Sequence, residues 1–300
     1  EDARTAAYMK AQGLNPDGTD NPNWADYINV DNFIDYLLVN WYTGNADWPS
    51  RNWYNGRERD LLDPAPLTGR RTSTGMHWFV WDSEWTLLLN STNDKTGDFN
   101  GACAPQRWLR NSLEYRVRFA DRAHRALFNG GPLTPQPCLD RYAAITRDHR
   151  SFIIPELARW GDQHGTLRTL ANWENAYNNI RVGYLSVRTP SLLAVLKGAG
   201  LYPQTDAPTF SRHGGSVVPT TPVTMATNAD RIYYTLDGTD PRLLGGAPHP
   251  NALVASFGAG GPTPVTYLNT GHVWKYLADG SDQGTAWRAA NFNDSAWPAG

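Results

Sequence analysis

Apolar residues recur at helical spacing near the start of the chain. The positions that carry this spacing are Phe33, Ile34, Leu37, Leu38 and Trp41. Residues three and four apart share one side of a helix, so the pattern predicts a helix over 31–41 with a solid apolar face. We expect Asp31 to act as its N-cap and Gly44, just past the last turn, to end it.

Two bulky segments then flank a stretch rich in proline, glycine and threonine. The pieces "NWYNGRERD" (52–60) and "GMHWFVWDSEWTLLL" (75–89) are predicted to be strands. In the second, large side chains alternate onto both faces, and we therefore expect a strand that is buried on both sides. This strand leads directly into Asp82.

Helices are predicted for the middle of the chain. The piece "NSLEYRVRFADRAHRALFNGG" offers Asn111 or Ser112 as a cap and Gly130 as a stop. The next helix has Thr134 as its cap and Pro135 in its first position, where proline is well tolerated. Further helical segments are expected at 151–160, at 172–187 and after Thr189 and Pro190.

The pattern changes again after Tyr202. Threonine, valine, proline and glycine dominate, and "IYYTLDGTDPR" alternates like a strand before a turn at Asp237 and Gly238. The fold class predicted is α+β, with a mostly helical body followed by β-modules. The domains expected are 1–203, a small β-sandwich at 204–244, a linker without periodicity at 245–265, and the start of a further β-module at 266–300.

Composition narrows the class of protein. Three hundred residues exceed one typical core, and the net charge of −2 comes without a basic stripe, which argues against nucleic-acid binding. No apolar run approaches the roughly 18 residues that span a bilayer. The low charge content of 19%, with 13 tryptophans, 27 glycines and 21 prolines, favours a secreted, multi-module bacterial protein. Because the chain begins at Glu1 rather than at methionine, we interpret it as part of a longer protein.

The sequence gives weaker evidence for a disulfide or a metal site. Cys103 and Cys138 are the only cysteines, and they form either a disulfide or two free buried thiols. The seven histidines lack the spacing of a metal site. The loop 13–29 holds Asp17, Asp20 and Asn21, but their spacing is not that of a calcium-binding EF-hand, so we predict an ordinary turn.

The strongest chemical signal lies in "GNADWPSRNWY" (44–54). Asp47 and Asn52 match the spacing D-x-x-x-x-N, in which protein kinases place the catalytic base and a magnesium ligand on one loop. Phosphoryl transfer also needs a second metal-binding carboxylate, and Asp82 follows its strand as such a residue does. The motif is weak alone, but its position between a packed helix and this strand strengthens it.

These pieces occur together in one known family. With "QGLNPDGTDNP", "VDNFIDYLLVNWYTGNADWPSRNWY", "FVWDSEWTLL" and "RFADRAHRALFNGGPLTP", the chain resembles the spore-coat protein H (CotH) kinase family over roughly residues 8–210. The resemblance implies the larger, mostly helical lobe of an atypical kinase that binds ATP and Mg²⁺ and modifies an extracellular or surface protein. It implies that Asp47 is catalytic and that Asn52 and Asp82 hold the metal. For Arg51, contact with a nucleotide phosphate and an ordinary ion pair are both open.

The chain also departs from kinases. No His-Arg precedes Asp47, and Ser83 and Glu84 follow Asp82 in place of Phe-Gly. No glycine-rich phosphate loop or strand lysine is evident, and we expect these parts upstream of Glu1. Without them, this part alone is expected to bind ATP weakly or not at all.

The C-terminal part has resemblances of its own. Residues 208–243 resemble the Ig-like module at the C-terminus of chitobiases, and 266–300 resemble the start of a galactose-binding-like jelly roll. Such modules imply a secreted or cell-surface location and carbohydrate as a further partner.

Two other functions are weighed. Asp82 and Glu84 between tryptophans could form the carboxylate pair of a glycoside hydrolase, although we expect Glu84 to pair with an arginine. The chain could also be a non-catalytic surface module that binds carbohydrate or protein. The tryptophans near the motif suggest a sugar platform, but we predict that they belong to the core. They are Trp48, Trp53, Trp81 and Trp85.

Overall fold

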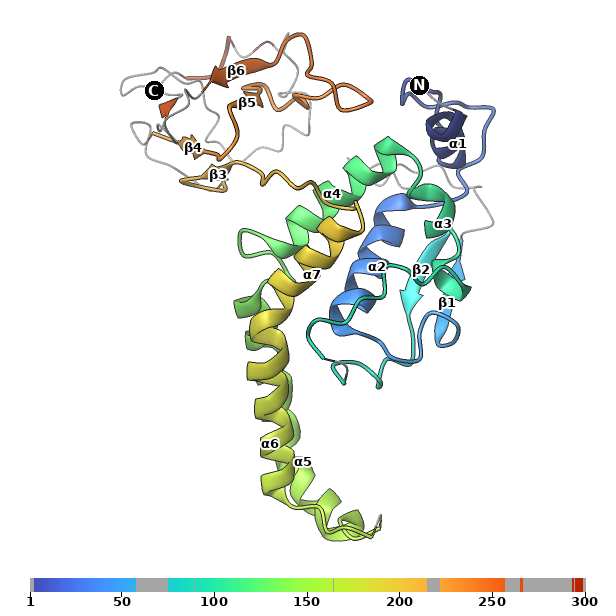
Figure 1. Ribbon diagram of the computed structural model, residues 1–300, viewed down its shortest axis with the longest axis vertical. Coiled ribbons are helices and arrows are strands. Elements are labelled where there is room, and N and C mark those ends of the chain that lie inside the picture. The colour runs from blue at the N-terminus through green and yellow to red at the C-terminus, as the bar shows by residue number, and fades with distance from the viewer. Residues whose placement is uncertain are drawn as a thin grey trace. The chain divides into compact units, whose positions relative to one another are not determined.

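The computed structural model describes residues 3–57, 75–88, 90–163, 165–214, 222–256, 265–266, 293 and 295–298 (Figure 1). Helices and small antiparallel sheets occur together, which confirms the α+β class in general. The chain divides into two compact units at Tyr202 and Pro203, here named unit 1 and unit 2. Among the described residues, no helix has both the length and the apolar character needed to cross a bilayer.

The central helix of unit 1 is α2 (Val30–Thr43), whose inward side chains are fully buried. Its N-cap is Asn29, which accepts a hydrogen bond from the Asn32 amide at 3.0 Å. The prediction that Asp31 caps this helix is therefore wrong by two positions. Asp31 lies in the first turn and instead forms an ion pair with Arg118 at 2.5 Å. Gly44 ends the helix in the left-handed conformation (φ 60°), as predicted.

Helix α4 (Leu113–Leu127) packs against α2, with the rings of Trp41 and Phe119 5.7 Å apart. The N-cap of α4 is Ser112, which confirms the second of the two predicted candidates, Asn111 and Ser112. The helix ends at Leu127, because Phe128 is already extended, and the predicted stop at Gly130 lies beyond its last turn.

The remaining N-terminal pieces of unit 1 are short. They are α1 (Ala3–Ala11), the 3₁₀ turn η1 (Gly101–Cys103) and α3 (Gln106–Leu109). The loop after α1 is built from turns, in which Asp17 accepts a hydrogen bond from the Thr19 amide at 2.9 Å and Asn21 accepts one from the Asn23 amide at 2.9 Å. These polar side chains stabilise the turns that the sequence predicts.

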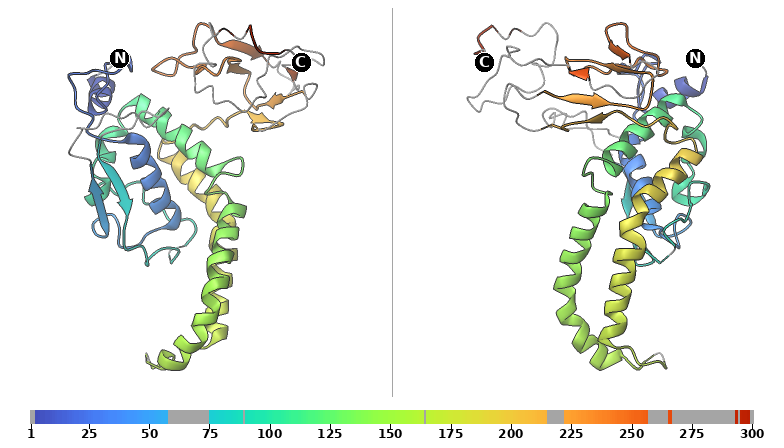
Figure 2. Two further views of the ribbon diagram at one scale, coloured as in Figure 1. Left: turned by 180° about the vertical axis from the view of Figure 1, so that it is seen from behind. Right: turned by 60° about the vertical axis from the view of Figure 1, so that its left-hand side comes forward.

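Two long helical stretches run side by side in unit 1 (Figure 2). The first is α5 (Pro135–Trp160), which begins at Thr134 and Pro135 as predicted but continues unbroken through the segment 151–160. The second consists of α6 (Leu170–Ile180), a π-helical turn η2 (Arg181–Leu185) and α7 (Ser186–Gly198). The prediction of a new helix at Thr189 and Pro190 is wrong, because both residues lie inside α7.

The sheet of unit 1 is a two-stranded hairpin of β1 (Trp53–Gly56) and β2 (His77–Val80), with Trp53 opposite Val80. Both strands are shorter than predicted. Trp78 is buried against Phe33 of α2, at 4.7 Å between rings, while Phe79 is exposed. The expectation of burial on both faces is therefore wrong, because α2 covers only one face of the hairpin.

Unit 2 is a β-structure with a small core of Met225, Ile232 and Ala255. Its strands are β3 (Thr209–Phe210), β4 (Thr224–Ala226), β5 (Arg231–Tyr234), β6 (Leu253–Ser256) and β7 (Val265–Thr266). They form two sheets, β3-β4-β7 and β5-β6. The expected linker at 245–265 is wrong, since β6 within it pairs with β5. Most of the module expected at 266–300 lies outside the described residues.

Candidate functional site

The loop 44–52 leaves α2 at Gly44 and is held by the side chain of Trp48. This indole is buried, and its Nε1 donates to the Tyr36 hydroxyl of α2 at 2.6 Å. Burial raises the pKa of Tyr36 to about 12, so the hydroxyl stays protonated at neutral pH. Lys95 donates to the Trp48 carbonyl at 3.0 Å. The loop is therefore fixed to the helix and to a second segment.

Gly101 fixes the same loop from the other side. The amide that follows it, on Ala102, donates to the Pro49 carbonyl at 3.0 Å. A Cβ atom on Gly101 would lie 1.9 Å from that carbonyl oxygen, and the residue has φ 47°. Only glycine fits this backbone conformation and this close approach without strain.

We therefore expect Gly101→Ala to destabilise unit 1 by about 1–3 kcal/mol, the range for forced overpacking. Gly97→Ala is the matched control, because a Cβ atom there meets nothing within 4 Å and no left-handed φ is involved. Denaturant unfolding of both variants checks the prediction. Equal midpoints would show that the loop adapts to the added methyl group.

Asp47, Asn52 and Asp82 come together at one end of the hairpin. The Nδ2 atom of Asn52 donates to Oδ2 of Asp47 and lies 3.4 Å from the main-chain carbonyl of Asp82. The pairing of Trp53 with Val80 explains this, since it brings the residue before β1 close to the residues that follow β2. The structure thus places the three predicted residues next to one another, with the Asp82 side chain exposed.

Two of these residues have an unusual backbone. Asn52 has φ 54° and Asp82 has φ 49°. The left-handed region is uncommon outside glycine, although asparagine and aspartate enter it more readily than other residues. Such conformations persist where the surrounding structure holds them, and they cluster at functional sites.

The carboxylate of Asp47 is only partly satisfied. Its Oδ2 accepts from Asn52, but its Oδ1 is buried and has no hydrogen-bond partner in the described part of the chain. A buried acceptor without a donor is costly. Because this oxygen is fully covered, a hydroxyl group on a bound molecule would supply the missing donor only after a shift of the loop 44–52.

The donors of this cluster fit magnesium that is shared with a nucleotide. Mg²⁺ is usually bound through one or two carboxylates together with phosphate oxygens and water. Asp82 offers a carboxylate and Asn52 an amide oxygen, whereas no group of three His, Cys, Asp or Glu residues gathers anywhere in the described ranges. Asp82 and Asn52 are oxygen donors of the kind that Mg²⁺ takes together with phosphate oxygens and water.

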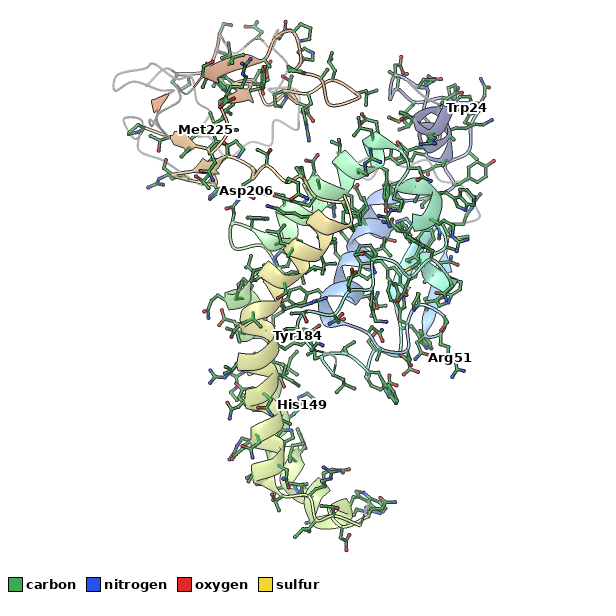
Figure 3. The ribbon with its side chains drawn as sticks, viewed as in Figure 1. Trp24, Arg51, His149, Tyr184, Asp206 and Met225 are labelled. Carbon is green, nitrogen blue, oxygen red and sulfur yellow. The ribbon has the colours of Figure 1, made fainter. Side chains whose placement is uncertain are left out.

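The charged neighbours are exposed. Arg51 lies at the surface of unit 1 (Figure 3), and neither it nor Glu84 forms an ion pair within the residues that the structure describes. The expected pairing of Glu84 with an arginine is thus wrong. Arg51 keeps its guanidinium available to a ligand.

An exposed aromatic face adjoins the cluster, and the sequence analysis missed it. The ring of Tyr54 stacks on Phe79 at 4.9 Å and meets Trp81 edge-on at 5.9 Å. The prediction that the nearby tryptophans belong to the core holds for Trp48. It is wrong for Trp53, Trp81 and Trp85, which are exposed by 37%, 59% and 55%. Alternation of Phe79 and Trp81 was the available signal, because Phe79 lies on the face of β2 opposite Trp78 and Trp81 continues this alternation just after the strand ends.

Both cysteines are free, buried thiols. The two alternatives for Cys103 and Cys138 were a disulfide and two free buried thiols, and the structure has the free thiols. Burial raises the pKa of Cys103 well above its usual value, which disfavours the reactive thiolate. We assign neither cysteine to the site.

No protein-family model matches this chain, and neither the curated proteins nor the solved structures give a match. The resemblance to kinases therefore stays a prediction from the sequence motif.

Proposed function

We propose that unit 1 is the larger lobe of an atypical kinase that transfers a phosphoryl group from ATP to a hydroxyl group of an extracellular or surface protein. The observation that carries this proposal is the contact of Asp47 with Asn52 beside Asp82, together with the unpartnered Oδ1 of Asp47. A base with a free acceptor, next to two oxygen ligands for a metal, is what this reaction requires.

The proposal assigns a role to each residue of the cluster. Asp47 accepts the hydrogen bond of the acceptor hydroxyl through Oδ1 and takes its proton as the oxygen attacks phosphorus. Asn52 orients Asp47 and, with Asp82, holds Mg²⁺. The metal neutralises phosphate charge when it is bound. Arg51, exposed and without an ion pair, contacts a phosphate.

The aromatic face gives a place for the base of the nucleotide. Trp81 immediately precedes Asp82, and Tyr54 lies two residues after Asn52. Exposed aromatic rings stack on the flat face of a nucleobase, which contributes roughly 1–3 kcal/mol per base. This arrangement would keep the base and the phosphates of one ATP at the same end of the hairpin.

The test is magnesium-dependent ATP binding by the full-length protein. Asp82→Ala is expected to weaken binding in the presence of Mg²⁺ by at least about tenfold, since a lost ion ligand costs more than about 1.4 kcal/mol. Glu84→Ala, an exposed acid two residues on, should leave binding unchanged. Titration calorimetry with and without Mg²⁺ measures both. Equal affinity of Asp82→Ala and the wild type would reject the assignment.

The exposed aromatic face also favours a second candidate, a non-catalytic surface module that binds carbohydrate. Sugar rings stack on such side chains as nucleobases do. A glycan array probed with the wild type and with Tyr54→Ala separates the two. Glycan binding that is lost in this variant, in a protein without magnesium-dependent ATP binding, would support the second candidate.

A further inference from the structure

The segment 94–103 holds two successive main-chain carbonyls of the loop 44–52. The Nζ atom of Lys95 donates to the Trp48 carbonyl at 3.0 Å, and the Ala102 amide donates to the Pro49 carbonyl at 3.0 Å. Trp48 directly follows Asp47 in the chain. The two contacts therefore fix the main chain one and two residues after the proposed general base.

The segment 94–103 is itself anchored within unit 1. Asp94 accepts hydrogen bonds from the amide and the hydroxyl of Thr96, at 2.8 and 2.7 Å, and Thr96 is buried. Arg110 links the Thr96 carbonyl, at 3.5 Å, to that of Ala199 just after α7, at 2.7 Å. A segment can position a catalytic loop only if other contacts keep it in place, and these contacts do so.

The ammonium group of Lys95 makes its shortest contact with this loop. The side chain is 12% exposed, and its other polar contact within the described residues is an ion pair with Asp98 at 3.7 Å. That distance exceeds a hydrogen bond, and the Asp98 side chain is 44% exposed, so the ion pair contributes little to stability. A covered cation with a single short hydrogen bond is a costly way to stabilise a fold. The contact with Trp48 is therefore the one that we interpret as functional.

We propose that Lys95 is a positioning residue for the phosphoryl transfer and acts on Asp47 through the carbonyl of Trp48. This inference rests on the proposed function. A hydrogen bond from a cation is about twice as strong as one from a neutral donor, so Lys95 holds the carbonyl firmly. A shift of the loop that uncovers Oδ1 of Asp47 then has a fixed point directly after this residue. The carboxylate thus returns to one place, as a catalytic group that must be held within about 0.5 Å requires.

The test measures transfer rates per folded molecule in the full-length protein, with the folded fraction obtained from circular dichroism. Lys95→Met removes the donor and should lower kcat by about 10- to 100-fold, the loss that a small misplacement of a catalytic group causes. The KM for ATP should not change, because Asn52 and Asp82 are intact. Lys95→Arg keeps a cationic donor and should recover most of the rate.

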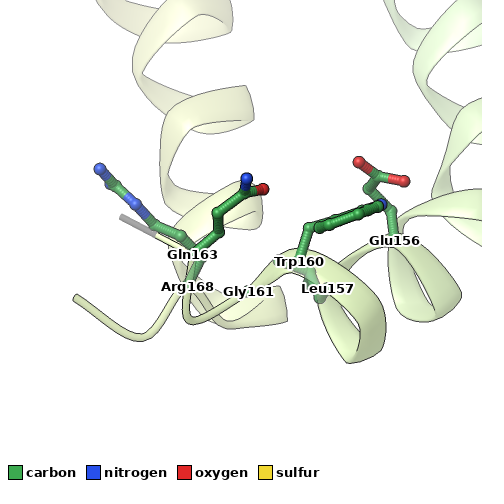
Figure 4. A pocket seen from close by; sticks show the side chains of 6 residues that line it. All are labelled: Glu156, Leu157, Trp160, Gly161, Gln163 and Arg168. Carbon is green, nitrogen blue, oxygen red and sulfur yellow. The ribbon is translucent and has the colours of Figure 1, made fainter. Parts of the chain in front are cut away.

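Two controls accompany these variants, and both should keep the wild-type kcat. Asp98→Asn removes the ion pair but leaves the hydrogen bond of Lys95 to Trp48. Arg168→Met also replaces a cation with methionine, but Arg168 is exposed and lines an open hollow at the turn between α5 and α6. The other residues that line this hollow are Glu156, Leu157, Trp160, Gly161 and Gln163 (Figure 4).

Hydrogen exchange of the amides in the loop 44–52 reports the positioning without any activity. Exchange should be faster in Lys95→Met than in the wild type and in Arg168→Met. A Lys95→Met protein with the wild-type kcat, or one whose KM for ATP rises as kcat falls, would overturn the inference. A wild type that transfers no phosphate rejects the proposed function instead. In that case, unchanged exchange in Lys95→Met would separately refute the role of Lys95.

Discussion

Replacing Arg188 with methionine is expected to destabilise unit 1 by about 3–5 kcal/mol, because the carbonyls of Trp41, Ser91 and Asn93 lose this donor, and that of Tyr42 keeps only the Tyr184 hydroxyl. The side chain is fully buried. Its guanidinium donates to the carbonyls of Tyr42 at 3.0 Å, Ser91 at 2.7 Å and Asn93 at 3.0 Å, and also to the carbonyl of Trp41. Methionine fills a similar volume but donates nothing.

The carbonyls involved explain why the effect should be large. Trp41 and Tyr42 lie in the last turn of α2, where carbonyls have no partner within the helix. Burial lowers the pKa of Arg188, because desolvation disfavours the cation. One side chain thus both satisfies the end of α2 and joins it to the segment around Ser91.

Urea unfolding checks the prediction. Arg188→Lys should lose part of the stability, because an ammonium group lacks the planar fork that reaches several carbonyls. Arg181→Met changes an exposed arginine nearby and should stay within about 0.5 kcal/mol of the wild type. If Arg188→Met and Arg181→Met unfold at the same denaturant concentration, the carbonyls have found other donors.

The helix ends show what local sequence can and cannot predict. Gly44, Ser112 and Thr134 were predicted because each acts through its own backbone or its immediate neighbours. The predicted N-cap of α2 was wrong because Asn29 and Asp31 are both residue types that favour that position. Only a tertiary contact, the ion pair of Asp31 with Arg118, distinguishes them. Pro190 does not begin a helix, since the preceding π-helical turn runs directly into α7.

The candidate site also has some features that the sequence predicts and others that it does not. The spacing of Asp47 and Asn52 was readable in the sequence, and the pairing of β1 with β2 then brings Asp82 to them. The buried Oδ1 of Asp47 and the role of Arg188 were not readable, because they depend on main-chain carbonyls and on burial. The aromatic face was predicted to be core, and it is exposed because only one side of the hairpin meets α2.

Asp47→Asn is expected to lower the rate of phosphoryl transfer by about 10²–10⁴-fold, the usual loss when a general base is removed. Asparagine keeps the size of the side chain and an oxygen that accepts hydrogen bonds, but it cannot take the proton. The affinity for ATP should change little, since Asn52 and Asp82 are intact. Steady-state transfer of labelled phosphate by the full-length protein measures the rate constant and the KM for ATP separately.

A merely structural aspartate would behave differently. If Asp47 only held its turn, Asp47→Asn would lower the unfolding midpoint and leave the rate per folded molecule unchanged. Asp162→Asn makes the same chemical change at an exposed site just after α5 and should alter neither quantity. A protein that binds ATP but transfers nothing in the wild type would reject the kinase itself. A selective loss of rate in Asp47→Asn alone would identify the carboxylate of Asp47 as the group that receives the proton.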